Sequence, residues 1–192
     1  SKHMEADESE TIHNLRECEA ILTGLFEKHD GRLFNTGGDS FLAEFPSAVS
    51  AVECAVDFQS VIKERNASAD TSVKLEFRIG INSGDVVKEK DNLLGDGVNI
   101  AARLEALAQT NGITVSKVIY DYVKGKTKYD FNDLGIQKVK QNEFHAFDLL
   151  LEPSQKRTIK RDRTHLKLLI SSICIVLFAV GGYLIFFPQS AN

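Results

Sequence analysis

The first third of the chain alternates between helical and strand-like hydrophobic patterns. Apolar side chains spaced three and four residues apart predict a helix over residues 5–29, and the same spacing predicts a second helix over residues 47–65. Between them, residues 32–45 are typical of two strands joined by a tight turn at residues 37–39. Ser47 is placed to cap the second helix, because its hydroxyl oxygen can accept a hydrogen bond from a first-turn amide.

Shorter elements follow up to residue 151. Residues 73–87 alternate well enough for a long strand or a hairpin, and residues 91–97 are expected to form a loop. The remaining expected elements are helices over residues 98–108 and 118–123 and strands over residues 113–115, 131–139 and 144–151. Helices packed on one face of a mostly antiparallel sheet predict an α+β domain over residues 1–151.

The C-terminal part has a different composition. Residues 168–187 carry no charge, and these 20 residues match the thickness of a bilayer core when helical. Residues 152–167 are rich in lysine and arginine, and a short tail, residues 188–192, follows the apolar run. The positive-inside rule therefore predicts a basic juxtamembrane linker and a single-pass helix in the inner or plasma membrane, with the N-terminal domain in the cytoplasm.

Charge and cysteine content narrow the function classes. The formal net charge of −4 does not favour nucleic acid as a partner. The three cysteines, Cys18, Cys54 and Cys174, form no CxxC pair, so we expect reduced thiols packed as small apolar side chains.

Three segments resemble the catalytic domain of class III nucleotidyl cyclases, the module of adenylate and guanylate cyclases. They are Asn-Thr-Gly-Gly-Asp-Ser-Phe-Leu-Ala-Glu-Phe (35–45), Phe-Arg-Ile-Gly-Ile-Asn-Ser-Gly-Asp-Val (77–86) and Leu-Gly-Asp-Gly-Val-Asn-Ile-Ala-Ala-Arg-Leu-Glu (94–105). Their order and spacing both match, and the third is the most specific. The resemblance implies a ferredoxin-like α+β palm and conversion of ATP or GTP to a 3′,5′-cyclic nucleotide and pyrophosphate, for signal transduction.

The resemblance also assigns roles to the site residues. Asp39, flanked by Gly37 and Gly38, would hold two Mg²⁺ or Mn²⁺ ions close to the phosphates. Asn99 and Arg103, four residues apart on one helix face, would orient the ribose and stabilise the charge on the transition-state phosphate.

Substrate-binding positions follow in the same way. Asn35 and Asn92 stand where the family reads the purine base, and an amide can both donate and accept hydrogen bonds, so either ATP or GTP can be accommodated. Lys140 aligns with a lysine that contacts the triphosphate, with Lys138 as a near competitor, whereas Arg78 is expected to support the sheet.

The family's opening strand, which ends in a second metal-binding aspartate, has no counterpart in this sequence. The residues at Ser1 look like those just after that strand, so we expect an N-terminally truncated domain that is inactive or nearly so alone. Family active sites form between two catalytic domains, so Asp39 would act in trans with Asn99 and Arg103 of a partner subunit in a homodimer.

Two other functions remain open. The Gly-Gly-Asp-Ser-Phe segment resembles the hairpin of diguanylate cyclases, although the helix carrying Asn99 and Arg103 has no counterpart there. A degenerate cyclase domain, serving in dimerisation or nucleotide sensing, is supported by Asn35 and Asn92. It is opposed by the intact Asp39, Asn99 and Arg103.

Overall fold

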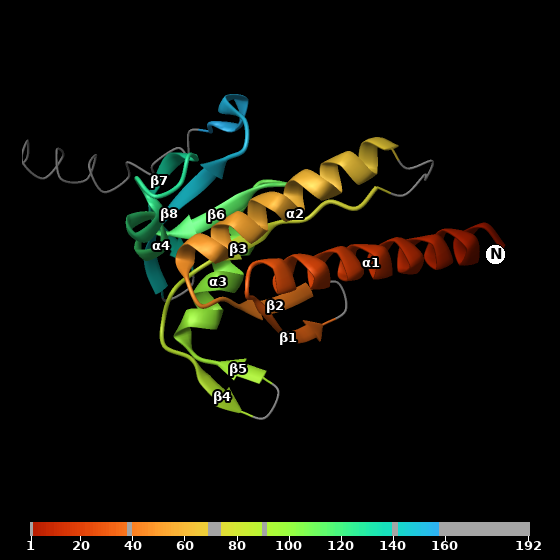
Figure 1. The fold of residues 1–192 in the computed structure, drawn as a ribbon, viewed down its shortest axis with the longest axis horizontal. Helices are drawn as coiled ribbons and strands as arrows, with labels where there is room; N and C mark the ends of the chain where they lie inside the picture. The colour runs from red at the N-terminus through yellow and green to blue at the C-terminus, as the bar shows by residue number, and fades with distance from the viewer. Residues whose placement is uncertain (1, 38–39, 69–73, 90–91, 140–141, 158–192) are drawn as a thin grey trace, which may run out of the picture. The chain divides into compact units, whose positions relative to one another are not determined.

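The computed structural model describes most of the first 157 residues (Figure 1). The described ranges are 2–37, 40–68, 74–89, 92–139 and 142–157. The chain divides into two units, Ser1–Arg157 and Thr158–Asn192, and everything described belongs to the first. Within the described ranges, no helix is both long and apolar enough to cross a membrane. The predicted span and Cys174 lie outside these ranges.

Two long helices form one layer of the domain. Helix α1 (Lys2–Lys28) and helix α2 (Ala48–Ser68) both appear where the apolar spacing predicts them, each a few residues longer than expected. The Ser47 hydroxyl accepts a hydrogen bond from the amide of Ser50 at 3.0 Å and so caps α2 as predicted. Apolar side chains at four-residue spacing meet between the helices: Cys18, Leu22 and Phe26 of α1 with Cys54, Phe58 and Ile62 of α2. Burial of this shared face holds the pair together.

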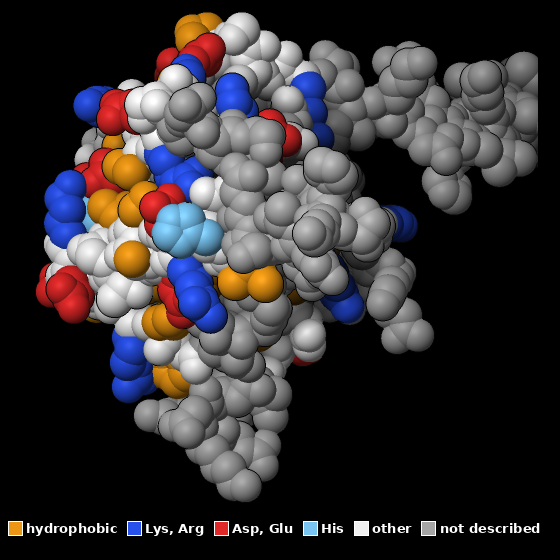
Figure 2. Space-filling model, turned by 90° about the vertical axis from the view of Figure 1, so that its right-hand side faces the viewer, with side chains coloured by type: hydrophobic (Ala, Val, Ile, Leu, Met, Phe, Trp, Pro, Cys, Tyr) orange, Lys and Arg blue, Asp and Glu red, His pale blue; other side chains and the backbone are white. Residues whose placement is uncertain are grey.

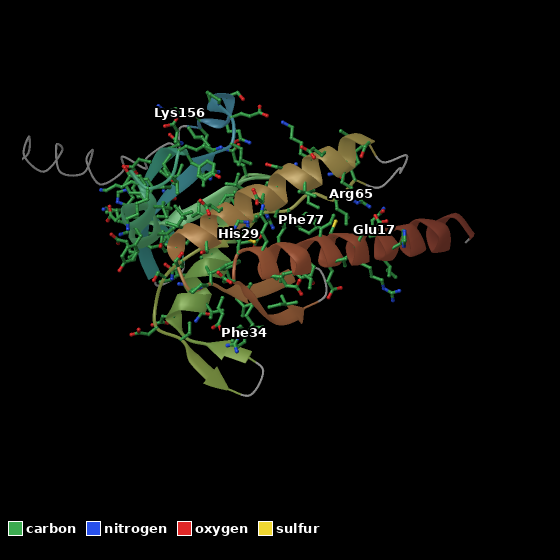
Figure 3. The ribbon with its side chains drawn as sticks, in the orientation of Figure 1. Glu17, His29, Phe34, Arg65, Phe77 and Lys156 are labelled. Atoms are coloured by element: carbon green, nitrogen blue, oxygen red, sulfur yellow. The ribbon has the colours of Figure 1, made fainter. Side chains whose placement is uncertain are left out.

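Polar contacts tie the two helices at both ends of this face (Figure 3). Near the start of the contact, Nη2 of Arg65 lies 2.6 Å from Oε2 of Glu17. Near its end, Oδ2 of Asp57 lies 2.6 Å from Nζ of Lys28 and 2.9 Å from Nε2 of His29. The apolar face is therefore bracketed by ion pairs that fix the register of α1 on α2.

A four-stranded sheet forms the second layer, with the strand order β3-β6-β8-β7. Strands β3 (Ile79–Ile81) and β6 (Ile113–Ser116) are parallel, and β6 is antiparallel to β8 (Asn142–Leu150). Strand β7 (Asp130–Val139) pairs with β8, also antiparallel. The mixed but mostly antiparallel sheet, with helices packed on it, confirms the α+β fold class.

Two hairpins complete the strands. Strands β1 (Arg32–Gly37) and β2 (Ser40–Glu44) form the first hairpin, with a bulge between Leu33 and Asn35. Strands β4 (Val87–Glu89) and β5 (Asn92–Leu94) form the second. Neither hairpin pairs with the four-stranded sheet within the described residues, although side chains from β1 and β2 share the apolar cluster under α1 and α2 with Ile79 of β3.

The expectations for residues 73–97 were only partly correct. The alternating segment contains the short strand β3 and ends in β4, while β5 occupies part of the expected loop. Among the described residues, side chains bond the backbone just before β3. The carbonyl oxygen of Phe77 accepts from Nε2 of Gln59 at 2.9 Å, and that of Leu75 from Nδ2 of Asn66 at 2.7 Å. The alternation of apolar and polar residues in this segment indicates that one of its faces is buried. It does not require that the segment pair with another strand.

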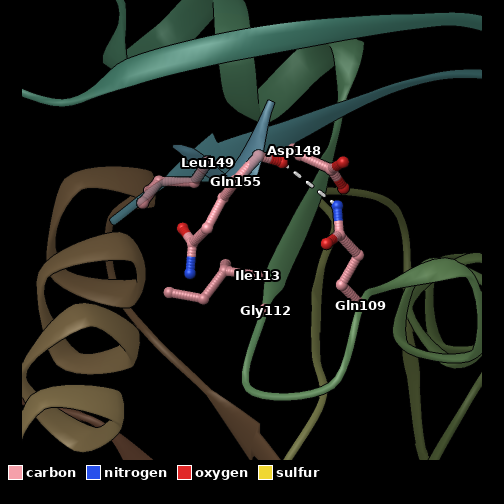
Figure 4. Close-up of a pocket in the computed structure, with 6 residues that line it drawn as sticks. All are labelled: Gln109, Gly112, Ile113, Asp148, Leu149 and Gln155. Atoms are coloured by element: carbon pink, nitrogen blue, oxygen red, sulfur yellow. Dashed lines mark hydrogen bonds between the residues drawn. The ribbon is translucent and has the colours of Figure 1, made fainter. Parts of the chain in front are cut away.

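The start of the predicted linker folds back onto the domain. A short 3₁₀ turn (Pro153–Gln155) leads to Arg157, which pairs with the buried carboxylate of Asp148 on β8. Gln109 donates a hydrogen bond to the carbonyl oxygen of Gln155 at 3.2 Å (Figure 4). The contacts of the folded unit therefore reach residue 157.

Candidate active site

Helix α3 (Asp96–Leu107) carries two of the residues assigned by resemblance, Asn99 and Arg103. It forms where the sequence predicts it, and its Leu104 is fully buried. The helix lies directly on β3. It is so close that a Cβ atom on Gly80 would overlap the carbonyl oxygen of Ala101 and the amide of Glu105. The absence of a side chain at Gly80 is thus what lets α3 approach the sheet so closely.

Arg103 has an unusual environment for an arginine on a short helix. The side chain is only partly exposed, and its Nη1 atom is buried without a hydrogen-bond partner among the described residues. A buried donor without a partner is unfavourable, and a guanidinium carries its charge permanently. An anionic group is the natural acceptor for this nitrogen.

Asn99 lies one helical turn before Arg103 and is exposed. Residues four apart project from the same side of an α-helix, so α3 presents an amide and a guanidinium together. Arg78, expected to play a supporting part, forms an ion pair with Glu105 of α3, with Nε 2.9 Å from Oε1.

The β1–β2 hairpin carries the remaining glycine-rich positions. Asn35 and Gly37 belong to β1, and Gly37 pairs with Ser40 of β2. Gly38 and Asp39 lie outside the described residues. The pairing of β1 with β2 matches the predicted hairpin.

Strand β5 carries Asn92 and adjoins the strand that carries Asn35. Asn92 begins β5, and β5 contacts both β1, which contains Asn35, and α3. The elements that carry Asn35, Asn92 and Asn99 therefore adjoin one another within one protomer.

Lys140 lies outside the described residues; in the sequence it follows β7 and precedes β8. Its competitor Lys138 forms a cross-strand ion pair with Glu143, with Nζ 3.2 Å from Oε2. That pairing occupies the Lys138 ammonium with a neighbouring carboxylate.

Within the part of the chain that the structure describes, no group of three His, Cys, Asp or Glu side chains is arranged to hold a metal ion. A small cavity of about 10 Å³ lies between β6, β8 and the 3₁₀ turn, lined in part by Ile113, Asp148 and Gln155 (Figure 4). This volume accommodates about one water molecule and is far too small for a nucleotide. Asn99 and Arg103 do not line it.

One face of the molecule mixes charges of both signs: Figure 2 shows acidic and basic side chains interspersed with apolar ones. Lys63 and Glu152 form one of the exposed ion pairs of the described residues. Sequence reasoning missed the contacts of Arg157, because nothing in the spacing of residues shows which carboxylate a linker arginine will reach.

Comparison with known proteins identifies the family. Residues 2–151 match the model of the adenylate and guanylate cyclase catalytic domain. The chain is 43% identical over 145 residues to a Rhizobium meliloti protein named "Putative adenylate cyclase 3"; the match covers 74% of this chain and 24% of that protein. The chain therefore spans about a quarter of the length of this relative.

Solved structures agree with the sequence comparison. A crystal structure titled adenylate/guanylate cyclase/hydrolase, from Silicibacter pomeroyi, matches with a TM-score of 0.71 and 30% identity, covering 79% of this chain and 90% of that one. The catalytic core of a rhodopsin-guanylyl cyclase with converted specificity, in complex with ATPαS, matches with a TM-score of 0.62 and 26% identity, covering 71% and 80%. From the matched motifs, the fold and these relatives, the chain belongs to the adenylate and guanylate cyclase catalytic domain family.

Proposed function

We propose that this domain, in its full-length protein, converts ATP or GTP to the 3′,5′-cyclic nucleotide. The ribose 3′-hydroxyl gives up its proton to solvent as its oxygen forms a bond to the α-phosphorus, and the bond from that phosphorus to the bridging oxygen breaks to release pyrophosphate. The Nη1 atom of Arg103, buried without a hydrogen-bond partner in the described part of the chain, is the observation that carries the proposal. A guanidinium held ready for an anion can stabilise the negative charge that develops on the α-phosphate.

The other side chains have complementary parts in this proposal. Asn99, one turn before Arg103, orients the ribose, and Lys140 contacts the triphosphate. Asp39 acts from the partner subunit of a homodimer and holds two Mg²⁺ or Mn²⁺ ions, which would neutralise phosphate charge. One carboxylate cannot complete such a site, so the proposal requires a second carboxylate ligand.

The β1–β2 hairpin and β3 pack against the same helices but belong to separate sheets in the described residues. We propose that residues 1–192 alone are inactive or nearly so, because Asp39 is a single carboxylate and cannot complete a two-metal site.

ATP is the favoured substrate in this proposal, because the Rhizobium meliloti relative is named "Putative adenylate cyclase 3". The amides of Asn35 and Asn92 are chemically able to bond either purine, so GTP remains the second substrate to test.

The test is to incubate the full-length dimer with ATP or GTP and Mg²⁺ or Mn²⁺, and to separate the products. Cyclic AMP or cyclic GMP, lost in Arg103→Ala, supports the proposal. Cyclic dimeric guanylate would instead establish a diguanylate cyclase, and no product from either nucleotide would favour a degenerate domain for dimerisation or nucleotide sensing.

The trans arrangement has its own test. Asp39→Ala and Arg103→Ala dimers are each expected to be inactive, whereas mixed dimers contain one site in which both residues are intact. Recovery of up to about half the activity per mixed dimer is therefore expected. Well-formed mixed dimers without activity would contradict the arrangement.

We also propose that residues 168–187 span the inner or plasma membrane, with the catalytic domain in the cytoplasm, because the basic residues 152–167 precede the apolar run. The full chain is expected to stay in the membrane fraction after alkaline carbonate extraction, and a chain ending at residue 167 to be released. Release of both would contradict the proposal.

A further inference from the structure

The segment around β3 and helix α3 run past one another in a regular register. Nδ2 of Asn82 donates a hydrogen bond to the carbonyl oxygen of Gly97 at 3.1 Å. The backbone of Gly80 meets that of Ala101, and Arg78 pairs with Glu105 at 2.9 Å. Every second residue of the strand segment therefore meets every fourth residue of the helix.

The dimensions of the two elements explain this register. Two residues of a strand advance by about 6.6 Å, and four residues of a helix advance by about 6.0 Å. The two steps are nearly equal, so contacts can repeat along the whole interface. Asn82 and Gly80 thus fix how far α3 is displaced along the sheet, whereas the Arg78–Glu105 ion pair is exposed and screened by solvent.

The same geometry determines where the proposed catalytic side chains point. Asn99 lies two residues after Gly97, and Arg103 two residues after Ala101, and two helical residues correspond to a rotation of about 200°. Asn99 and Arg103 are therefore on the side of α3 opposite to its contact with the strand segment. A shift of the contact face moves both side chains with it.

The first turn of α3 depends on its contact with the segment around β3 more than later turns do. Its N-cap is Gly95, which provides no side-chain hydrogen bond. Gly84 passes close to Gly97, where a Cβ atom on Gly84 would lie 3.1 Å from the Gly97 Cα atom. Asn82 thus bonds a turn that has no side-chain cap, two residues before Asn99.

We propose that Asn82 is a positioning residue for nucleotide cyclisation: its amide sets the position of the first turn of α3, and through it that of Asn99. This rests on the proposed function. Asn82→Asp is nearly isosteric but replaces the donor with an oxygen that faces the carbonyl oxygen of Gly97. The matched control is Arg78→Ala, which removes the contact at the far end of the same interface.

Both variants should be measured in the full-length dimer for kcat, KM and hydrogen exchange. Because small displacements of reacting groups reduce rates strongly, Asn82→Asp should lower kcat about tenfold or more while KM stays within about twofold. Amide exchange should rise at residues 98–101. Arg78→Ala should leave kcat close to that of the wild type, and any faster exchange should be confined to the last turn of α3.

The opposite results would overturn the proposal. Asn82→Asp with wild-type kcat, or an equal loss of kcat in Arg78→Ala, would show that Asn82 has no special positioning part. If the wild-type protein makes no cyclic nucleotide, the proposed function fails and hydrogen exchange alone decides: unchanged exchange at residues 98–101 in Asn82→Asp then rejects the positioning of α3 by Asn82.

Discussion

Arg157 and Asp148 form a two-point ion pair that closes the folded unit at its C-terminal end. Nε of Arg157 lies 2.6 Å from Oδ2 of Asp148, and its Nη2 lies 2.9 Å from Oδ1. The same Nη2 donates to the carbonyl oxygen of Leu107, the last residue of α3, at 2.9 Å. One side chain therefore joins the exit of the chain to a central strand and to the helix that carries Asn99 and Arg103.

Replacing Arg157 with alanine should destabilise the domain by about 2–3 kcal/mol, because it leaves a buried charge without its partner. Asp148 is only 5% exposed and would retain one described side-chain partner, the hydroxyl of Thr114 at 2.8 Å. Urea unfolding followed by circular dichroism measures the change.

The control for Arg157→Ala is Lys63→Ala, which removes an ion pair with Glu152 on the exposed surface. Solvent screens this pair, so the variant should unfold at nearly the same urea concentration as the wild type. Equal midpoints for the two variants would show that the Arg157 pair contributes no more than a surface pair.

Gly80→Ala should destabilise the domain by about 2–3 kcal/mol through overpacking. The added methyl group would overlap the backbone of α3 at Ala101 and Glu105, and neither backbone can rotate away. Gly24→Ala provides the control, since a Cβ atom there meets nothing within 4 Å and the residue lies inside α1.

Gly24→Ala is expected to raise stability by about 0.5–1 kcal/mol, because alanine is the better helix former. Thermal unfolding of both variants makes the comparison direct. A Gly80→Ala protein as stable as the wild type would mean that α3 does not contact β3 as closely as the structure shows.

The sequence alone predicted the elements whose hydrophobic pattern involves only residues close together in the chain. Helices α1 and α2 follow from the spacing of residues such as Leu22 and Phe58, because each helix buries one face against the other. Helix α3 and the β1–β2 hairpin were predicted at their observed places. The position of Asn99 and Arg103 on one helix could be predicted for the same reason, since it depends only on helical periodicity.

Features that depend on distant partners could not be predicted in this way. The alternation of Leu75, Phe77 and Ile79 shows that one face is buried, but it does not show that side chains of α2 bond the backbone there. The contact between Arg157 and Leu107 joins residues 50 positions apart. Only the folded chain shows such pairings.

The domain should become less stable as the pH is lowered, and protonation of Asp57 should be one of the causes. The side-chain hydrogen bond from Lys28, followed by that from His29, holds the pKa of this carboxyl below its usual value. The unfolded state therefore binds the proton more readily, so the stabilisation is present above the unfolded pKa of about 4 and is lost as pH falls through the lower, folded pKa.

Asp57→Asn should consequently be less stable than the wild type at pH 7, and the difference should shrink as pH falls below about 4. Urea unfolding of both proteins at pH 7, 5 and 3 measures it. A difference that stays constant or widens at pH 3 would show that the Asp57 carboxylate is not stabilised by Lys28 and His29 in the folded state.

Cys54 should be nearly unreactive toward alkylating agents in the folded protein. Burial between α1 and α2 raises the pKa of its thiol to about 11, and the side chain is only 2% exposed. The thiolate is the reactive form, and at pH 8 it would be on the order of one part in a thousand of the total. Modification by iodoacetamide must therefore wait for the helices to separate.

Cys18 faces the same cluster, and burial also raises its pKa, so both thiols should react together and only as the α1–α2 interface opens. Mass spectrometry of the peptides containing Cys18 and Cys54 follows this reaction, and the same protein in urea gives the unprotected rate. Protection of both sites should disappear at the urea concentration at which the domain unfolds. Rapid labelling of Cys54 with Cys18 still protected would mean that α2 leaves the cluster without α1, which the paired burial of these two residues argues against.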